Sequence, residues 1–160
     1  MNLRQRILIA SHRSGSGHVP SCFSVLEMLQ AVYAVLRKDD IFVLSKGHAQ
    51  LAYYAVLAEH GFIEMDELDS VGLPGSRLGC HPTRYIPGVA VSTGSLGHGI
   101  GVALGMALAL RGTGRHVYTL VGDGESNAGR DGESWDVFSN ELATAVVDAV
   151  MACDAGGGVQ

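Results

Sequence analysis

Short apolar runs alternate with longer helical patterns along this chain, and this alternation limits its possible folds more than any other feature. The predicted strands are the mostly apolar runs 41–44, 117–121 and 145–153. The predicted helices are 21–36, where hydrophobic residues repeat at three and four, and 49–60, 96–111 and 134–145. Strands that alternate with helices predict an α/β fold with a parallel sheet flanked by helices. Ligands of such folds bind at the carboxyl ends of the strands.

Composition narrows the class of protein further. The 160 residues suit a single domain, and a hydrophobic content of 47% is enough for a core. The net charge is −5 and the 11 lysines and arginines form no basic stripe, which argues against nucleic-acid binding. Charged residues make up only 17% of the chain. That low share fits either a surface partly covered by a partner chain or a small, lightly charged monomer.

The cysteines and the apolar segments predict a cytoplasmic protein. Cys22, Cys80 and Cys153 form no CxxC pair, so neither a disulfide framework nor a zinc site is expected. The apolar run Ile7–Ala10 is too short for a signal peptide. The longest apolar region, Ile100–Leu110, contains glycines and is shorter than the ~20 residues of a membrane span.

A glycine turn with an acidic centre follows the predicted strand 117–121. In Gly122-Asp123-Gly124-Glu125 the glycines let backbone N–H groups approach a phosphate, and the carboxylate suits a hard cation such as Mg²⁺. The alternative is an ordinary Asp-Gly turn. An EF-hand loop is excluded because Ala128 and Ser134 occupy its glycine and glutamate positions.

Gly97, Gly101 and Gly105 recur every four residues, which places them on one face of the predicted helix 96–111. Each costs roughly 1 kcal/mol in a helix relative to alanine, so the face is expected to serve close packing or a ligand. A dinucleotide-binding motif does not fit, because the third glycine and the following acid are missing at the required spacing.

Four of the seven histidines lie beside glycine in loops or at helix starts, where they are suited to hydrogen bonding near a ligand. These are His18, His48, His81 and His98. The alternative for each is a solvated side chain. Their spacing contains no HxH or i,i+4 pair that would predict a metal cluster, and the chain has no GxSxG nucleophile motif.

Taken in order, five segments of the chain resemble the motifs of the transketolase family. They are Ser16-Gly17-His18, Leu44-Ser45-Lys46-Gly47-His48-Ala49, Gly79-Cys80-His81-Pro82, Ser92-Thr93-Gly94-Ser95-Leu96-Gly97-His98-Gly99 and Val121-Gly122-Asp123-Gly124-Glu125. The resemblance implies a thiamine-diphosphate-binding fold. Residues 1–160 would then form one diphosphate-binding domain that is incomplete at its C-terminus.

The resemblance also implies a cofactor, a partner and roles for individual residues. The cofactors would be thiamine diphosphate and Mg²⁺ (or Ca²⁺), and a pyrimidine-domain subunit would complete the site in a hetero-oligomer. The substrate would be a sugar or keto acid. The implied catalytic residues are His18, His48 and His81. The implied cofactor-binding residues are His48, Gly94, Leu96, His98, Gly122, Asp123, Gly124 and Glu125, with Asp123 as the metal ligand.

The sequence departs from the family pattern at several positions. Val19 replaces a proline, Ala128 replaces a glutamate, and Trp135 comes about three residues late. Gly156 occupies the place of an asparagine that would ligate Mg²⁺. Despite these departures, the resemblance makes a split enzyme that transfers a two-carbon ketol or acyl unit the leading hypothesis. The alternatives are a stand-alone phosphate-binding α/β module and a non-catalytic structural or regulatory subunit.

Overall fold

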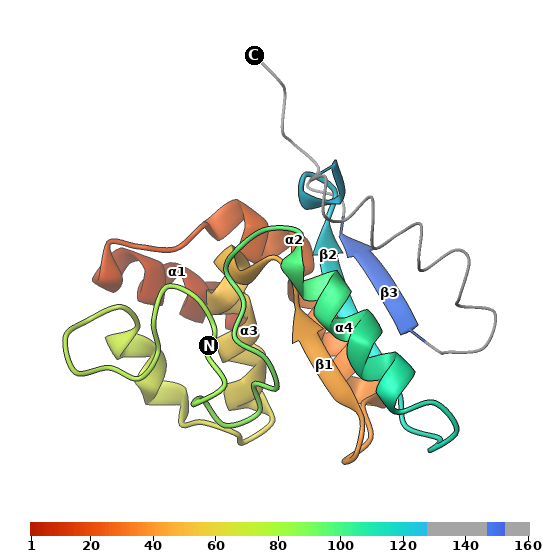
Figure 1. The fold of residues 1–160 in the computed structure, drawn as a ribbon. Helices are drawn as coiled ribbons and strands as arrows, with labels where there is room; N and C mark the ends of the chain where they lie inside the picture. The colour runs from red at the N-terminus through yellow and green to blue at the C-terminus, as the bar shows by residue number, and fades with distance from the viewer. Residues whose placement is uncertain (128–146, 153–160) are drawn as a thin grey trace.

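A parallel sheet forms the centre of the fold. The computed structural model describes residues 1–127 and 147–152 of the chain. Strands β1 (Ile41–Leu44), β2 (Val117–Gly122) and β3 (Val147–Ala152) lie in the order β1-β2-β3 (Figure 1). Both neighbouring pairs are parallel, with Ile41 beside Val117 and Val117 beside Val147. The predicted α/β architecture and its three strands are confirmed, with ends shifted by no more than two residues.

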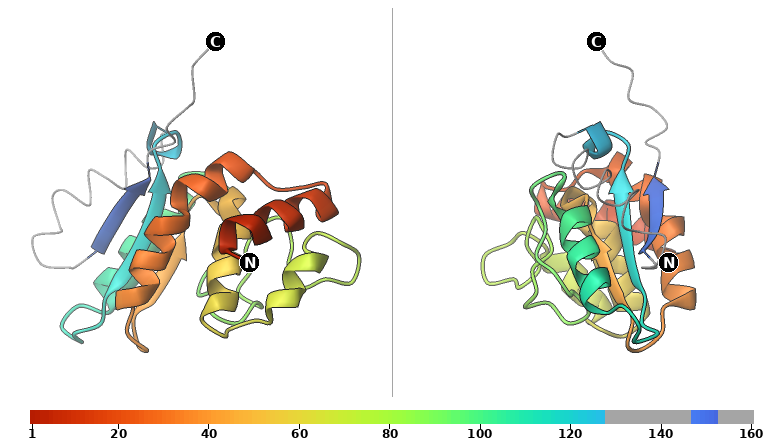
Figure 2. Two further views of the ribbon diagram at one scale, coloured as in Figure 1. Left: turned by 180° about the vertical axis from the view of Figure 1, so that it is seen from behind. Right: turned by 45° about the vertical axis from the view of Figure 1, so that its right-hand side comes forward.

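Helices cover both faces of this sheet. Helix α4 (His98–Ala109) packs on one face, and α2 (Val19–Val35) lies on the opposite face (Figure 2). Val43 and Val117 of the strands are buried against Ala103 and Ala107 of α4. The small alanine side chains let the helix axis come close to the sheet, which fixes where the start of α4 meets the ends of the strands.

A second group of helices packs beside the sheet. It consists of α1 (Leu3–Ser14), α3 (Gln50–Glu59) and the short 3₁₀ segment η2 (Met65–Ser70), which contact one another. Every residue from Gln50 to Leu57 is buried, so α3 is a core helix rather than an amphipathic surface helix. Two further 3₁₀ turns, η1 (Gly47–Ala49) and η3 (Glu125–Asn127), follow the ends of β1 and β2.

The helix starts predicted from the sequence differ from those in the structure at several points. Helix α1 was not predicted, and a capping box between Asn2 and Gln5 starts it. Helix α2 begins at Val19, two residues before the prediction, because the His18 side chain caps it. Helix α4 begins at His98 rather than residue 96, since Gly97 is in the left-handed conformation (φ 79°). The predicted helix 134–145 lies outside the described residues.

The glycines of α4 differ in how closely they approach other segments. Gly105 is exposed, and a Cβ built on it would meet no atom within 4 Å, so its position serves no close packing among the described residues. A close approach occurs at Gly99, where a Cβ would lie 2.5 Å from the Cα of Ser45. Glycine at position 99 therefore lets the first turn of α4 touch the end of β1.

At the opposite end of the sheet, Asp40 joins the segments that lead into β1 and β2. Its carboxylate accepts hydrogen bonds from the backbone N–H groups of Arg37 and His116 and from the Arg37 guanidinium. The Asp40 side chain is only 1% exposed. These donors, with the guanidinium contributing most, hold the pKa of Asp40 well below its usual range.

Within residues 1–127 and 147–152, no helix combines the length and the apolar character needed to cross a membrane.

Replacing Gly99 by alanine should destabilise the chain by roughly 1–3 kcal/mol, because the new methyl group would collide with the Cα and side chain of Ser45, directly after β1. The matched control is Gly105→Ala on the same helix. It should be neutral or stabilising by up to about 1 kcal/mol, since its Cβ meets open space. Thermal and urea unfolding of the two variants would measure the difference, and equal stability would contradict the packing role of Gly99.

The depressed pKa of Asp40 predicts an acid-dependent loss of stability. Because the folded pKa lies below the unfolded value of about 3.9, the carboxylate stabilises the fold above that pH. The contribution disappears as the pH falls through the folded pKa. Asp40→Asn should cost roughly 1–3 kcal/mol at pH 7 and should flatten the pH dependence of unfolding below pH 5. The exposed neighbour Asp39→Asn is the control, and an unchanged slope in Asp40→Asn would refute the prediction.

Candidate functional site

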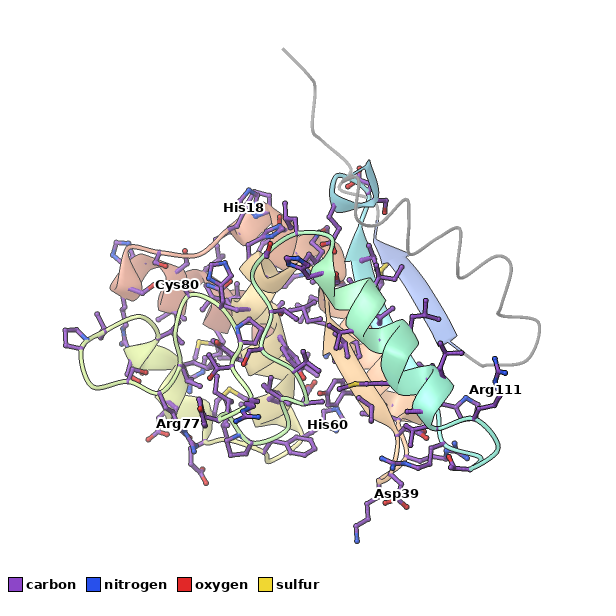
Figure 3. The ribbon with its side chains drawn as sticks, viewed as in Figure 1. His18, Asp39, His60, Arg77, Cys80 and Arg111 are labelled. Carbon is purple, nitrogen blue, oxygen red and sulfur yellow. The ribbon has the colours of Figure 1, made fainter. Side chains whose placement is uncertain are left out.

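A pocket of about 220 Å³ lies at the carboxyl ends of β1 and β2. Its walls come from the start of α2, the segment after β1, the loop before α4 and the turn after β2. The residues that line it are His18, Ser21, Lys46, His48, Leu96, Gly122, Gly124 and Glu125. Figure 3 shows His18 at this end of the molecule and Asp39 at the opposite end. The pocket therefore occupies the place where an α/β fold binds its ligand.

Tertiary structure brings most of the predicted site residues together. Six of them line the pocket, namely His18, His48, Leu96, Gly122, Gly124 and Glu125. Four predicted residues are not in its lining, namely His81, Gly94, His98 and Asp123. Asp123 nevertheless stands between two lining glycines, and His98 is the exposed first residue of α4.

One serine connects the two histidines of the pocket. The backbone N–H of Ser21 donates to Nδ1 of His18 at 3.1 Å, and the Ser21 hydroxyl lies 3.1 Å from Nε2 of His48. The two imidazole rings stand edge to face with their centroids 5.5 Å apart. Ser21 itself is only 1% exposed. The polar wall of the pocket is thus built on a buried residue in the first turn of α2.

A buried lysine forms the floor of the pocket. Lys46 is 1% exposed, and its Nζ lies 3.4 Å from the Ser24 hydroxyl. A Cβ built on Gly122 would come within 3.5 Å of this nitrogen, so the lysine lies directly against the end of β2. Lys46 therefore places an ammonium group beside the glycine turn after β2, and a positive charge there would attract an anionic ligand.

Buried polar contacts hold the ends of the strands in place. The Ser45 hydroxyl after β1 donates a hydrogen bond to the Glu125 carboxylate after β2. Glu125 is only 3% exposed, so this carboxylate joins two loops across the base of the pocket. The Thr93 hydroxyl donates to the carbonyl of Leu44 at 2.7 Å and ties the loop before α4 to the same edge.

Two glycines bring His81 next to these loops. A Cβ on Gly47 would lie 2.9 Å from the backbone nitrogen of Gly94, and a Cβ on Gly94 would lie 3.1 Å from Cδ2 of His81. The buried Tyr54 hydroxyl donates to the carbonyls of Gly79 and His81. Burial raises the pKa of Tyr54, so its hydroxyl stays protonated as a donor. His81 is therefore fixed beside the loop before α4, although it does not line the pocket.

Asp123 is exposed at the tip of the turn after β2, and its Oδ1 accepts a hydrogen bond from the N–H of Gly124 at 2.8 Å. The described part of the chain contains no cluster of three histidine, cysteine, aspartate or glutamate side chains that would hold a metal. Mg²⁺ commonly takes several of its oxygen ligands from a bound anion and from water, so a single carboxylate can suffice on the protein side. Gly156, the second predicted metal position, lies outside the described residues.

A larger hollow of about 440 Å³ lies at the opposite end of β1 and is lined mainly by aromatic and apolar residues, with Arg37, Lys38, Asp40 and His60 among its polar ones. None of the predicted site residues lines it. The smaller pocket is the better candidate because its two histidines and its lysine suit a ligand that carries hydroxyl groups and negative charge.

Ser21 and Lys46 were not among the predicted site residues. Lys46 stands within the predicted motif around His48, but sequence alone does not distinguish a buried lysine from a solvated one. Ser21 lies three residues after His18, a spacing that is typical of a capped helix start. That spacing was the available signal for its position beside the histidines.

Comparison with known proteins shows the family of the chain. The family described as "Transketolase, thiamine diphosphate binding domain" matches residues 6–140. One subunit of the apulose-4-phosphate transketolase of Phocaeicola vulgatus is 38% identical over 79% of the chain, which covers 49% of that protein. The 6-deoxy-6-sulfo-D-fructose transketolase subunit of a Clostridium species is 37% identical over 84% of the chain and 52% of its own length. The chain thus spans about half the length of these relatives.

Solved structures show the same fold. The transketolase of Leishmania mexicana matches 94% of the chain and 27% of its own length, with a TM-score of 0.75 and 27% identity. The transketolase of Campylobacter jejuni covers 92% of the chain and 26% of its own, with a TM-score of 0.81 and 24% identity, which supports the fold alone.

The glycine contacts of the site predict a graded response to alanine. Gly47→Ala should be the most destabilising, by roughly 1–3 kcal/mol, because its Cβ would meet backbone. Gly94→Ala should cost less and should shift the NMR signals of the His81 ring, which can move by a few tenths of an ångström. Gly124→Ala is the control, since its Cβ would meet no atom within 4 Å. Unfolding curves and histidine NMR spectra would test this order, and an unshifted His81 in Gly94→Ala would contradict it.

Proposed function

This chain belongs to the transketolase family, and on that basis we propose that it is the diphosphate-binding subunit of a split enzyme. The enzyme would transfer a two-carbon ketol or acyl unit with thiamine diphosphate, in the cytoplasm. The observation that carries this proposal is the convergence of His18, His48 and the Gly122–Gly124 turn on one pocket above a buried lysine. These groups suit a diphosphate at one end and sugar hydroxyls at the other.

The residues of the pocket fit the diphosphate. Gly122 and Gly124 expose backbone at the end of β2, Lys46 supplies a buried positive charge beside it, and Leu96 offers an apolar surface that is 46% exposed. Asp123 would bind Mg²⁺ together with diphosphate oxygens and water. Gly94 lies on the loop before α4 and His98 is the first residue of that helix. Both would contact the cofactor from the α4 side of the pocket. Glu125 would lie along the diphosphate, with its carboxylate held in place by the hydrogen bond from Ser45.

The histidines would manage the substrate. Bound thiamine diphosphate supplies the electron sink for cleaving a carbon–carbon bond, so the protein has to position groups and move protons. His18 and His48 face the pocket and would hydrogen-bond the hydroxyls of a donor ketose. His81 would reach the same substrate from the neighbouring loop.

A partner subunit would complete the site. The two relatives described above are named as subunits of transketolases, and this chain covers only half of each. We therefore propose a pyrimidine-domain partner that covers the pocket and supplies the remaining cofactor contacts, in a hetero-oligomer.

Calorimetric titration of thiamine diphosphate should show Mg²⁺-dependent binding when the chain is co-purified with the transketolase-like protein encoded beside it. Asp123→Ala should weaken that binding at least about tenfold with Mg²⁺ present and should change it little in a chelator. Asp39→Ala is the control, an exposed carboxylate at the opposite end of the molecule (Figure 3). Unchanged Mg²⁺-dependent affinity in Asp123→Ala would refute the assignment of the metal ligand.

The departures at Ala128 and Gly156 favour a second candidate, a structural or regulatory subunit that has kept the fold and lost the metal site. No binding by the wild-type complex, with binding gained in Gly156→Asn, would support this candidate over the enzyme. Turnover of a ketose donor that is lost in His81→Ala would exclude it.

A further inference from the structure

We propose that Ser21 is a positioning residue that sets the ring orientation of His48 and the proton position of His18. This inference rests on the proposed function for its catalytic consequence, but its structural content does not. Ser21 is buried in the first turn of α2 and contacts both histidines through different atoms, its backbone nitrogen and its hydroxyl. One residue therefore contacts both imidazole rings of the pocket.

The contact with His18 fixes where that ring carries its proton. Nδ1 of His18 accepts a hydrogen bond from the N–H of Ser21 and caps the helix. A nitrogen that accepts a hydrogen bond carries no hydrogen, so neutral His18 has its proton on Nε2. Nε2–H, on the opposite edge of the ring, remains available as a donor in the pocket.

The contact with His48 fixes the direction of its ring. The Ser21 hydroxyl engages Nε2 of His48 at 3.1 Å, and the edge of one ring meets the face of the other at 5.5 Å between centroids. Because Ser21 stands on the helix that His18 caps, both rings contact the first turn of α2. This coupling would present two proton-transfer groups to the substrate in a constant geometry.

The two contacts respond differently to mutation, which makes the proposal testable. Ser21→Ala removes the hydroxyl that binds His48 and keeps the backbone N–H that binds His18. Ser21→Thr restores a hydroxyl. Ser70→Ala is the control, because it removes a half-buried serine hydroxyl in η2 that does not line the pocket.

The first experiment is ¹⁵N NMR of histidine-labelled full-length chain without cofactor or partner. We expect His18 as the Nε2–H tautomer at pH 8 in wild type, Ser21→Ala and Ser70→Ala. We expect the ring signals and tautomer balance of His48 to change in Ser21→Ala only, and to return toward wild type in Ser21→Thr. A dominant Nδ1–H tautomer of His18, or an unaltered His48 in a folded Ser21→Ala, would overturn the proposal.

The second experiment measures ketol transfer by the chain assembled with its partner. Losing one hydrogen bond that positions His48 should lower kcat roughly three- to tenfold with little change in KM, and Ser21→Thr should recover most of it. An equal kcat in Ser21→Ala would overturn the catalytic part of the proposal. No transfer by the wild-type complex would refute the proposed function, whereas the NMR result would still decide the role of Ser21.

Discussion

Close contact between backbones at two glycines holds the candidate site together. Gly99 lets the first turn of α4 lie against Ser45, and Gly47 lets the turn after β1 lie against Gly94. A side chain at either position would push these segments apart, because the opposing atoms include backbone atoms that cannot rotate away. The pocket depends on this spacing, since its walls are the same segments.

Buried polar contacts then fix the segments that the glycines allow to meet. Ser45 joins Glu125 across the two strand ends, and Thr93 joins the loop before α4 to the carbonyl of Leu44. Polar groups in the interior are normally hydrogen-bonded, so each of these residues has one favourable arrangement and limits how the loops move.

Much of the fold and part of the site could be predicted from the sequence. The strands at 41–44 and 117–121 were evident as apolar runs, and α2 from the spacing of Leu26, Leu29 and Val32. Helix α1 was missed because its capping residues, Asn2 and Gln5, are common and its apolar pattern is short. The close approach of Gly99 to Ser45 was not predicted, since the repeat of every fourth residue does not show which glycine meets the segment after β1.

The sequence by itself determined the alternation of strands and helices, the glycine turn after β2 and the identity of the polar residues in the motifs. These follow from local patterns, because periodicity and turn chemistry depend on neighbours in the chain. Only the tertiary structure decided that His18 and His48 share Ser21 and that Lys46 is buried against Gly122. Such contacts join segments far apart in the sequence, and their distances are set by how helices and loops pack on the sheet.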